Sequence, residues 1–133
     1  MDEPSSYCAP EKLAEAYIQH IRANITTVGL RFKNRDKNLE TLKRFNITTV
    51  VVSETVMGLG VANYSHCREA EQGSSESAWV FGVEQFGEEV YVKLKTKRLS
   101  TGEEFTICVS YHVAEYPLAY PYAGRSSGRQ RGA

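Results

Sequence analysis

The chain has 133 residues, with 16 basic and 16 acidic side chains, so its formal net charge at pH 7 is zero. This length predicts one domain whose single core needs neither disulfides nor a metal ion. Zero net charge argues against a general nucleic-acid-binding protein, since such proteins are usually basic overall. Any anion-binding surface must therefore be a local patch.

The three cysteines, Cys8, Cys67 and Cys108, are odd in number and lack the spacing of a disulfide framework. The sequence shows neither the pattern of an export signal nor an apolar run that could span a membrane. We therefore expect a reduced, cytoplasmic protein that does not engage a membrane. His66-Cys67, and Cys108 with His112, lack zinc-finger spacing, so we expect no metal site and no other cofactor.

The first half of the chain has helical patterns. Residues 1–9 are expected to be loose, and Pro10 suits the first turn of a helix that ends near Asn24. Its apolar residues at helical spacing are Leu13, Tyr17, Ile18 and Ile21. A second helix is expected from about Asp36 to Asn46. Its buried residues are expected to be Leu39, Leu42 and Phe45. The intervening Leu30 and Phe32 are assigned to a connecting segment.

Residues 47–60 fit either of two elements, because their valines favour a strand and their threonines could cap a helix. Residues 68–77, rich in Glu, Gln, Gly and Ser, predict a mobile loop before a sheet. Residues 123–133, rich in Gly, Ser and Arg, predict a disordered tail. Residues 10–122 are thus expected to form the single domain.

Residues 90–98 alternate strictly between two chemistries, which a strand places on its two faces. One face carries Val90, Val92, Leu94 and Thr96. The other carries Tyr91, Lys93, Lys95 and Lys97. A row of three ammonium groups indicates an anion-binding surface. The alternative is that these lysines are solvated charges that protect an edge strand from aggregation.

The next residues predict a hairpin, since Ser100-Thr101-Gly102-Glu103 has glycine where a type I′ turn needs positive φ. The resulting pairs are Lys97 with Thr106, Lys95 with Cys108, Lys93 with Ser110, and Tyr91 with His112. The residues added to the apolar face are Phe105, Ile107, Val109 and Tyr111. His112 is therefore expected beside Tyr91 and Lys93.

Upstream, a turn at Phe86-Gly87 predicts a third antiparallel strand. It would place Trp79, Phe81 and Val83 opposite Leu94, Val92 and Val90. After the last strand, two prolines that each follow a tyrosine predict an extended segment laid across the sheet. The predicted fold is an α+β domain, with N-terminal helices packed on one face of a small antiparallel sheet.

Several short motifs follow one another in a distinctive order. They are Trp79-Val80-Phe81-Gly82, Val90-Tyr91-Val92-Lys93-Leu94-Lys95, Val109-Ser110-Tyr111-His112, Ala114-Glu115-Tyr116-Pro117-Leu118 and Tyr120-Pro121-Tyr122. Together, and with weaker similarity at Gly58-Leu59 and Tyr64, they resemble the MqsR-like toxins of bacterial toxin–antitoxin systems over roughly residues 12–122. The resemblance implies a RelE-like fold, a helix over residues 48–58, and a metal-independent endoribonuclease that cuts messenger RNA and is neutralised by a cognate antitoxin.

In the best-known branch of that family, the site combines a tyrosine and a lysine on the middle strand with a lysine near the chain end. The first two match Tyr91 and Lys93, and the third position holds His112 here. A further lysine of the family, beside the tyrosine that matches Tyr64, is replaced by Ser65.

Metal-free RNA cleavage needs a base for the 2′-hydroxyl, cations for the phosphorane and an acid for the leaving 5′-oxygen. Histidine is the side chain type that titrates near neutrality, so His112 suits the base or the acid. Lys93 is expected to hold the phosphate, and Tyr91 to donate a proton or stack on a base. The plainer alternatives are a surface histidine at a strand end and simple cross-strand packing of Tyr91.

Further RNA contacts are predicted for Lys95, Lys97, Arg98, Tyr64, Glu115 and Tyr120. Glu115 could instead be a solvated loop charge, and Tyr116 is expected to pack on the core. The predicted function is a metal-independent endoribonuclease toxin whose partners are single-stranded messenger RNA and a cognate antitoxin. One alternative is a non-catalytic module that binds RNA or the antitoxin through the same cationic face. Another is a structural domain whose lysines only keep the sheet soluble.

Overall fold

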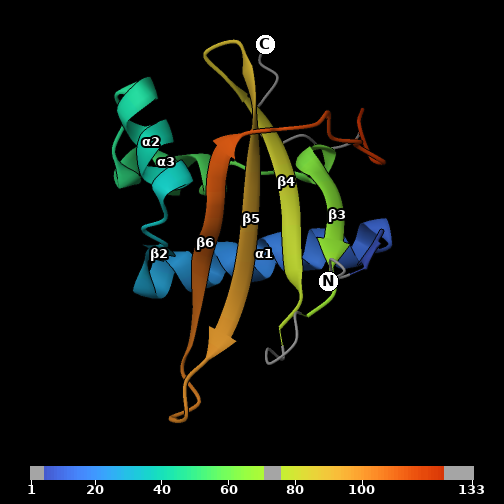
Figure 1. Cartoon of the computed structure of the whole chain (residues 1–133). Helices are drawn as coiled ribbons and strands as arrows, with labels where there is room; N and C mark the ends of the chain where they lie inside the picture. The colour runs from blue at the N-terminus through green and yellow to red at the C-terminus, as the bar shows by residue number, and fades with distance from the viewer. Residues whose placement is uncertain (1–4, 71–75, 125–133) are drawn as a thin grey trace.

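The computed structural model describes residues 5–70 and 76–124, and these form an α+β domain (Figure 1). The helices are α1 (Glu11–Val28), α2 (Asp36–Phe45) and α3 (Thr49–Met57), and a short 3-10 helix spans Val61–Asn63. The strands are β1 (Ser6–Tyr7), β2 (Leu30–Phe32), β3 (Tyr64–Arg68), β4 (Ala78–Gln85), β5 (Glu88–Arg98) and β6 (Glu104–Val113). They form one sheet in the order β1-β3-β4-β5-β6-β2, antiparallel except that β2 runs parallel to β6.

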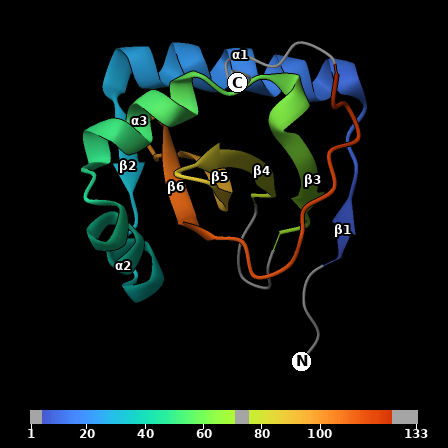
Figure 2. The same cartoon turned by 90° about the horizontal axis from the view of Figure 1, so that it is seen from above.

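Helices α1 and α3 lie on the side of the sheet opposite the segment that follows β6. Figure 1 shows α1 running behind the strands, and Figure 2 shows α1 and α3 on one side with α2 beside the β6 edge. The chain that follows β6 passes over the opposite side (Figure 2). The predicted class, with helices first and an antiparallel β4-β5-β6 meander after them, is confirmed.

Helix α1 is one turn longer than expected. Its buried residues are Ala14, Ile18, Ile21 and Ile25. Because Ile25 continues the apolar stripe, the helix runs past Asn24 and ends before Gly29, whose φ of 84° is typical of glycine. Leu13 lies outside the stripe and is 53% exposed.

Helix α2 begins and ends as predicted, and its last residue precedes Asn46 in the left-handed conformation. The expectation for its buried face is partly right: Leu42 and Phe45 are partly buried against the core, but Leu39 is exposed and the fully buried residues are Asn38 and Thr41. Asn38 is buried because its amide bonds to backbone groups of the sheet. The ambiguous residues that follow form the helix α3, as the family resemblance implied.

The N-terminal residues that the structure describes are not loose. Ser6 and Tyr7 form a short strand that pairs with Arg68 and Cys67, and Ala9 is buried. Leu30 to Phe32, expected in a connecting segment, form the edge strand β2. The rest of the predicted N-terminal segment, the centre of the predicted loop at 68–77 and most of the predicted tail lie outside the described residues.

The register of the central hairpin is partly as predicted. Trp79, Phe81 and Val83 pair with Leu94, Val92 and Val90, as expected from the Phe86-Gly87 turn. On the other side of β5, Tyr91 pairs with His112 and Lys93 with Ser110, also as expected. The remaining pairs are displaced by one residue, so Lys95 faces Ile107 and Lys97 faces Phe105. The predicted pairs with Cys108 and Thr106 are wrong.

Two irregularities explain this displacement. Leu99 pairs with Glu103, since its N–H donates to the Glu103 carbonyl at 2.7 Å, so the loop holds three residues instead of two. The register then shifts between Lys93 and Leu94, which leaves Val109 as the extra residue of a β-bulge in β6. The longer loop moves the register by one residue and the bulge moves it back.

The shift reverses the faces of β6 near the hairpin. Thr106 and Cys108 point into the core, and Phe105 and Ile107 share the face of the β5 lysines, which corrects their predicted place on the apolar face. The Thr106 hydroxyl is satisfied by donating to Asn24 Oδ1 at 2.8 Å.

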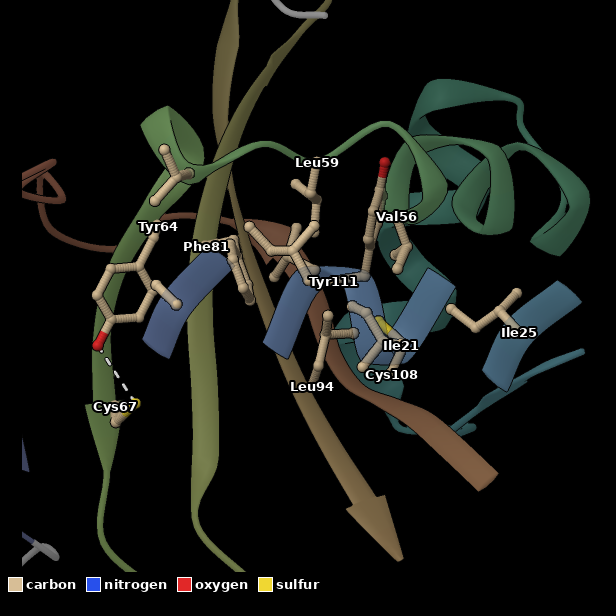
Figure 3. Close-up of a cluster of buried hydrophobic side chains, with 14 of the residues drawn as sticks. Ile21, Ile25, Val56, Leu59, Tyr64, Cys67, Phe81, Leu94, Cys108 and Tyr111 are labelled. Carbon is tan, nitrogen blue, oxygen red and sulfur yellow. Dashed lines mark hydrogen bonds between the residues drawn. The ribbon is translucent and has the colours of Figure 1, made fainter. Parts of the chain in front are cut away.

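The core lies between the sheet and helices α1 and α3 (Figure 3). The large buried side chains labelled there include Ile21, Leu59, Tyr64, Phe81, Leu94 and Tyr111. Trp79 closes one side by stacking on Tyr17, with ring centroids 4.2 Å apart.

Candidate functional site

The outer face of the sheet, opposite α1, carries the cationic side chains. Strand β5 is an interior strand, with β4 on one side and β6 on the other. Its lysines therefore do not protect an edge, and that alternative is excluded. The same interior position gives them neighbours from both flanking strands.

One part of this face forms an open groove of about 550 Å³, which we name the reaction groove. It contains the three predicted catalytic residues, Tyr91, Lys93 and His112, together with Glu115. Its other basic lining residues are Arg35, Lys37, His66 and Arg68. The structure thus brings together side chains from β3, β5, β6, α2 and the segments that follow β2 and β6.

Tyr91 and His112 stack across the β5–β6 pair, with ring centroids 5.2 Å apart and planes inclined by 17°. His112 Nδ1 lies 3.0 Å from the carbonyl oxygen of Val113. Since a carbonyl only accepts, Nδ1 carries the hydrogen in this contact, and Nε2 is the nitrogen left for proton exchange.

A second imidazole, His66, lines the same groove and was considered in the sequence only as a metal ligand. Its Nδ1 lies 2.9 Å from Ser65 Oγ. Burial lowers the pKa of His66, and nearby Arg68 lowers it further. His66 was missed because strand β3 was not predicted. Its alternation with Arg68 along Tyr64-Ser65-His66-Cys67-Arg68 is the signal that indicates its face.

The extended segment after β6 walls one end of the reaction groove, as its prolines predicted. Glu89 anchors it: Leu118 donates its N–H to Glu89 Oε1 at 3.4 Å, and Tyr120 donates its hydroxyl to Glu89 Oε2 at 2.5 Å. A Cβ on Gly82 would lie 2.0 Å from the Tyr120 oxygen, so only glycine lets the segment approach β4 this closely.

Other predicted residues of this segment lie at the mouth of the groove. Glu115 pairs with Lys37, and this pairing lowers the pKa of the carboxyl group. Tyr116 was expected to pack on the core, but it is 79% exposed and presents a free ring edge to solvent. Tyr120 is half-buried, donates its hydroxyl to Glu89 and does not line the groove, so its position does not support the predicted RNA contact.

The prediction that Tyr64 contacts RNA is wrong. Its side chain is fully buried, and its hydroxyl accepts the N–H of Ala9 at 2.9 Å. Burial raises the pKa of this phenol far above its ordinary value. Figure 3 also shows its contact with Cys67, at 3.2 Å.

A second groove of about 500 Å³, which we name the basic groove, continues along β6 toward the hairpin. Its β5 row consists of Lys93, Lys95 and Lys97. A β2 row on the other side consists of Arg31, Lys33 and Arg35, and the floor consists of Phe105, Ile107 and Val109. The β2 row was not predicted, although Leu30-Arg31-Phe32-Lys33 alternates as an edge strand does.

The two remaining predicted cations lie toward the hairpin. Lys97 is part of the β5 row and lies 3.9 Å from a carboxylate oxygen of Glu76. Arg98 forms an ion pair with Glu104 at 3.0 Å and lines neither groove. Its predicted RNA contact therefore finds no support in its position.

Within residues 5–70 and 76–124, no group of three or more His, Cys, Asp or Glu side chains is arranged to hold a metal ion. Cys67 and Cys108, the thiols considered for zinc, are buried in the core. The described helices include none with the length and apolar character needed to cross a membrane.

Comparison of the chain with protein-family models, with curated proteins and with solved structures found no significant match.

Proposed function

We propose that this protein is a metal-independent endoribonuclease of the toxin–antitoxin type, which cleaves single-stranded messenger RNA. The observation that carries the proposal is the stacked Tyr91–His112 pair beside Lys93 in one open, cationic groove. A histidine next to a row of ammonium groups supplies both proton transfer and phosphate binding. The motifs that resemble MqsR-like toxins support the same activity.

The proposed reaction is attack of the 2′-oxygen on the adjacent phosphorus. A base removes the 2′-hydroxyl proton, the bond from phosphorus to the 5′-oxygen breaks, and an acid protonates that oxygen. The products are a 2′,3′-cyclic phosphate and a 5′-hydroxyl end. Lys93 and Arg35, which line the groove, stabilise the charge on the phosphorane.

Two imidazoles are available for the two proton transfers. His66 has a lowered pKa, so it is neutral near pH 7 and suited to accept a proton. His112 lines the same groove, and its Nε2 is the ring nitrogen that the backbone contact of Nδ1 leaves for proton exchange. The exposed ring of Tyr116 at the mouth is suited to stack on an unpaired base.

Such a toxin acts in the cytoplasm and needs a protein partner that blocks its groove. The three free cysteines agree with a reducing compartment. An acidic antitoxin segment would complement the cations of the outer face. The cytoplasmic location and the antitoxin partner both follow from the proposed activity.

The test is cleavage of labelled single-stranded RNA by the purified protein in excess chelator. Cleavage should persist, and mass spectrometry should find 2′,3′-cyclic phosphate ends. Lys93→Ala should lose activity but keep its circular dichroism spectrum, since the side chain faces outward. Lys12→Ala, on the exposed side of α1, is the control with the same charge change.

Cleavage that stops in chelator and returns with magnesium would contradict the mechanism. Salt-dependent RNA binding with no cleavage would favour the alternative, a module that binds RNA without cutting it. An unfolded Lys93→Ala protein would mark this lysine as structural, and Lys93→Gln would then be compared.

A further inference from the structure

The basic groove has a construction that the cleavage chemistry does not require. It places the β2 row and the β5 row on opposite sides of an apolar floor formed by β6. Cross-strand pairing fixes this arrangement, because Arg31 and Lys95 both pair with Ile107, from opposite sides. Strands are about 4.8 Å apart, so the two rows are separated by roughly 10 Å at the backbone.

This spacing suits one polynucleotide strand. Alternate residues of a β-strand lie about 6.6 Å apart, comparable to the distance between successive phosphates of an extended single strand. Each row thus offers several cations along one direction, which matches a chain of phosphates better than a single anion.

The floor adds a feature that favours nucleic acid. The Arg31 guanidinium lies over the Phe105 ring, with its carbon 3.9 Å from the ring centroid. Unpaired bases stack on guanidinium groups as they do on aromatic rings, so this pair offers RNA a stacking surface. Ile107 and Val109 extend the apolar surface toward the reaction groove.

The basic groove and the reaction groove are continuous, because Arg35 and Lys93 line both. A strand whose scissile phosphate lies between Lys93 and His112 can therefore continue along β6 without leaving the cationic surface. No rearrangement of the sheet is required for this path.

We propose that the basic groove binds the single-stranded RNA that flanks the cleavage site, with phosphates along the two rows and bases on the floor. The inference rests on the proposed function for its substrate, and it extends the site from one phosphate to a segment of several nucleotides. An acidic polypeptide is the competing occupant, since it would also neutralise the rows. An acidic polypeptide would make no use of a guanidinium over an aromatic ring, whereas RNA bases can stack there, so RNA is favoured.

The test measures binding separately from cleavage. The probe is a fluorescein-labelled RNA dodecamer of mixed sequence, 2′-O-methylated so that it cannot be cut, titrated by anisotropy at several salt concentrations. The variant Arg31→Gln/Lys95→Gln removes the two cations that face each other across Ile107. Lys12→Gln/Lys43→Gln removes two exposed cations that line neither groove.

We expect the groove variant to bind the dodecamer at least tenfold more weakly and to lower the slope of log K against log salt by about 1.4. The control should keep the parent slope. Both should keep the parent melting temperature within a few degrees. On cleavable RNA, the groove variant should raise KM for long substrates.

An unchanged salt slope in the groove variant would overturn the inference even if cleavage is confirmed. Loss of dodecamer binding in a protein that cuts no RNA would support the groove and reject the endoribonuclease. Binding of poly-glutamate through Arg31 and Lys95, with no binding of the dodecamer, would assign the groove to an acidic protein and overturn the RNA path.

Discussion

The two halves of the β5–β6 pair present different chemistry on the same outer face. Toward the end of β6, that face carries Tyr91, Lys93 and His112, which are polar and suited to reaction. Toward the hairpin, the β6 side chains on it are Phe105 and Ile107, which are apolar. The β-bulge at Val109 separates the halves. One extra residue thus places the polar side chains of the proposed reaction site and the apolar side chains of the proposed binding floor on the same face.

The bulge is stable because α2 satisfies its backbone. Asn38 donates from Nδ2 to the carbonyls of Lys33 and Val109, and its Oδ1 accepts the N–H of Tyr111 at 2.9 Å. The buried amide therefore supplies the partners that the irregular ladder lacks. It also ties the β2 row to β6.

The largest effect is expected in the reactive half. His112→Ala should lower the RNA cleavage rate ~10²–10⁴-fold, because a proton-transfer group is lost. RNA affinity should change little, since it is set mainly by the cations. Single-turnover kinetics and anisotropy measure the two quantities separately.

His20 provides a control of the same residue type. It is exposed on α1 and paired with Glu104 at 2.6 Å, outside both grooves. His20→Ala should cleave at the parent rate. His112→Lys should bind RNA at least as well as the parent and lose the pH dependence that an imidazole gives near neutrality. Parent activity with a parent pH profile in His112→Ala would make this histidine a bystander.

The next effect concerns the junction between the halves. Asn38→Ala should lower the free energy of unfolding by about 1–3 kcal/mol, because it removes three hydrogen bonds to the backbone and leaves the buried N–H of Tyr111 without this partner. Urea denaturation followed by circular dichroism measures the change. Leu39→Ala, at the exposed neighbouring position, should change it by no more than about 0.5 kcal/mol. Equal stability of the two variants would show that Asn38 does not hold the bulge.

A smaller effect is expected at the hairpin. Gly102 has a φ of 95°, and a Cβ there would meet no atom within 4 Å, so Gly102→Ala is opposed by backbone conformation alone. We expect a loss of about 1–2 kcal/mol in unfolding free energy. Cleavage by the folded protein should be unchanged, since Asn38 fixes the register beyond the bulge. Loss of activity at full folding would show that the loop also sets the reactive half.

The sequence predicts the pairing of Tyr91 with His112 correctly, but for an incomplete reason. A two-residue turn at Thr101-Gly102 places Tyr91 beside His112, but the actual loop has three residues, and the bulge cancels the resulting displacement. The turn signal fixes that a hairpin forms and does not fix its length, because glycine at positive φ suits both loops. In the residues between the loop and the bulge, the displacement of one residue is not yet cancelled. The faces on which Phe105 and Ile107 lie are therefore predicted wrongly.

Other features differ in how visible they are in the sequence. The β2 row follows from the alternation of Arg31 and Lys33 with apolar residues, so it can be found once a strand is considered there. The role of Asn38 cannot be predicted from the sequence, because it depends on a bulge more than 70 residues later in the chain. The hydrogen bonds of Asn38 to Val109 and Tyr111 show this dependence. Tyr64 was predicted as an RNA contact from a resemblance in residue type, and such a resemblance does not show whether a side chain is buried.

The smallest effect is the pH dependence of stability that His66 contributes. In the unfolded chain a histidine has a pKa near 6.5, and in the folded protein burial and Arg68 lower the pKa of His66. The folded state therefore binds fewer protons than the unfolded state below that pH. Stability should fall as the pH drops from about 6.5 through the lowered folded-state pKa, and be fully present above 6.5.

His66→Gln removes this contribution and leaves the surrounding charges in place. Urea denaturation at several pH values gives the unfolding free energy of each protein. The parent value minus the variant value should decrease as the pH is lowered from about 7.5 to about 5. Lys93, Arg35 and His112 line the same groove, but they are common to both proteins and cancel in the difference. If this difference does not depend on pH, the folded protein does not lower the pKa of His66. The proposal that it accepts a proton from RNA would then lose its electrostatic basis.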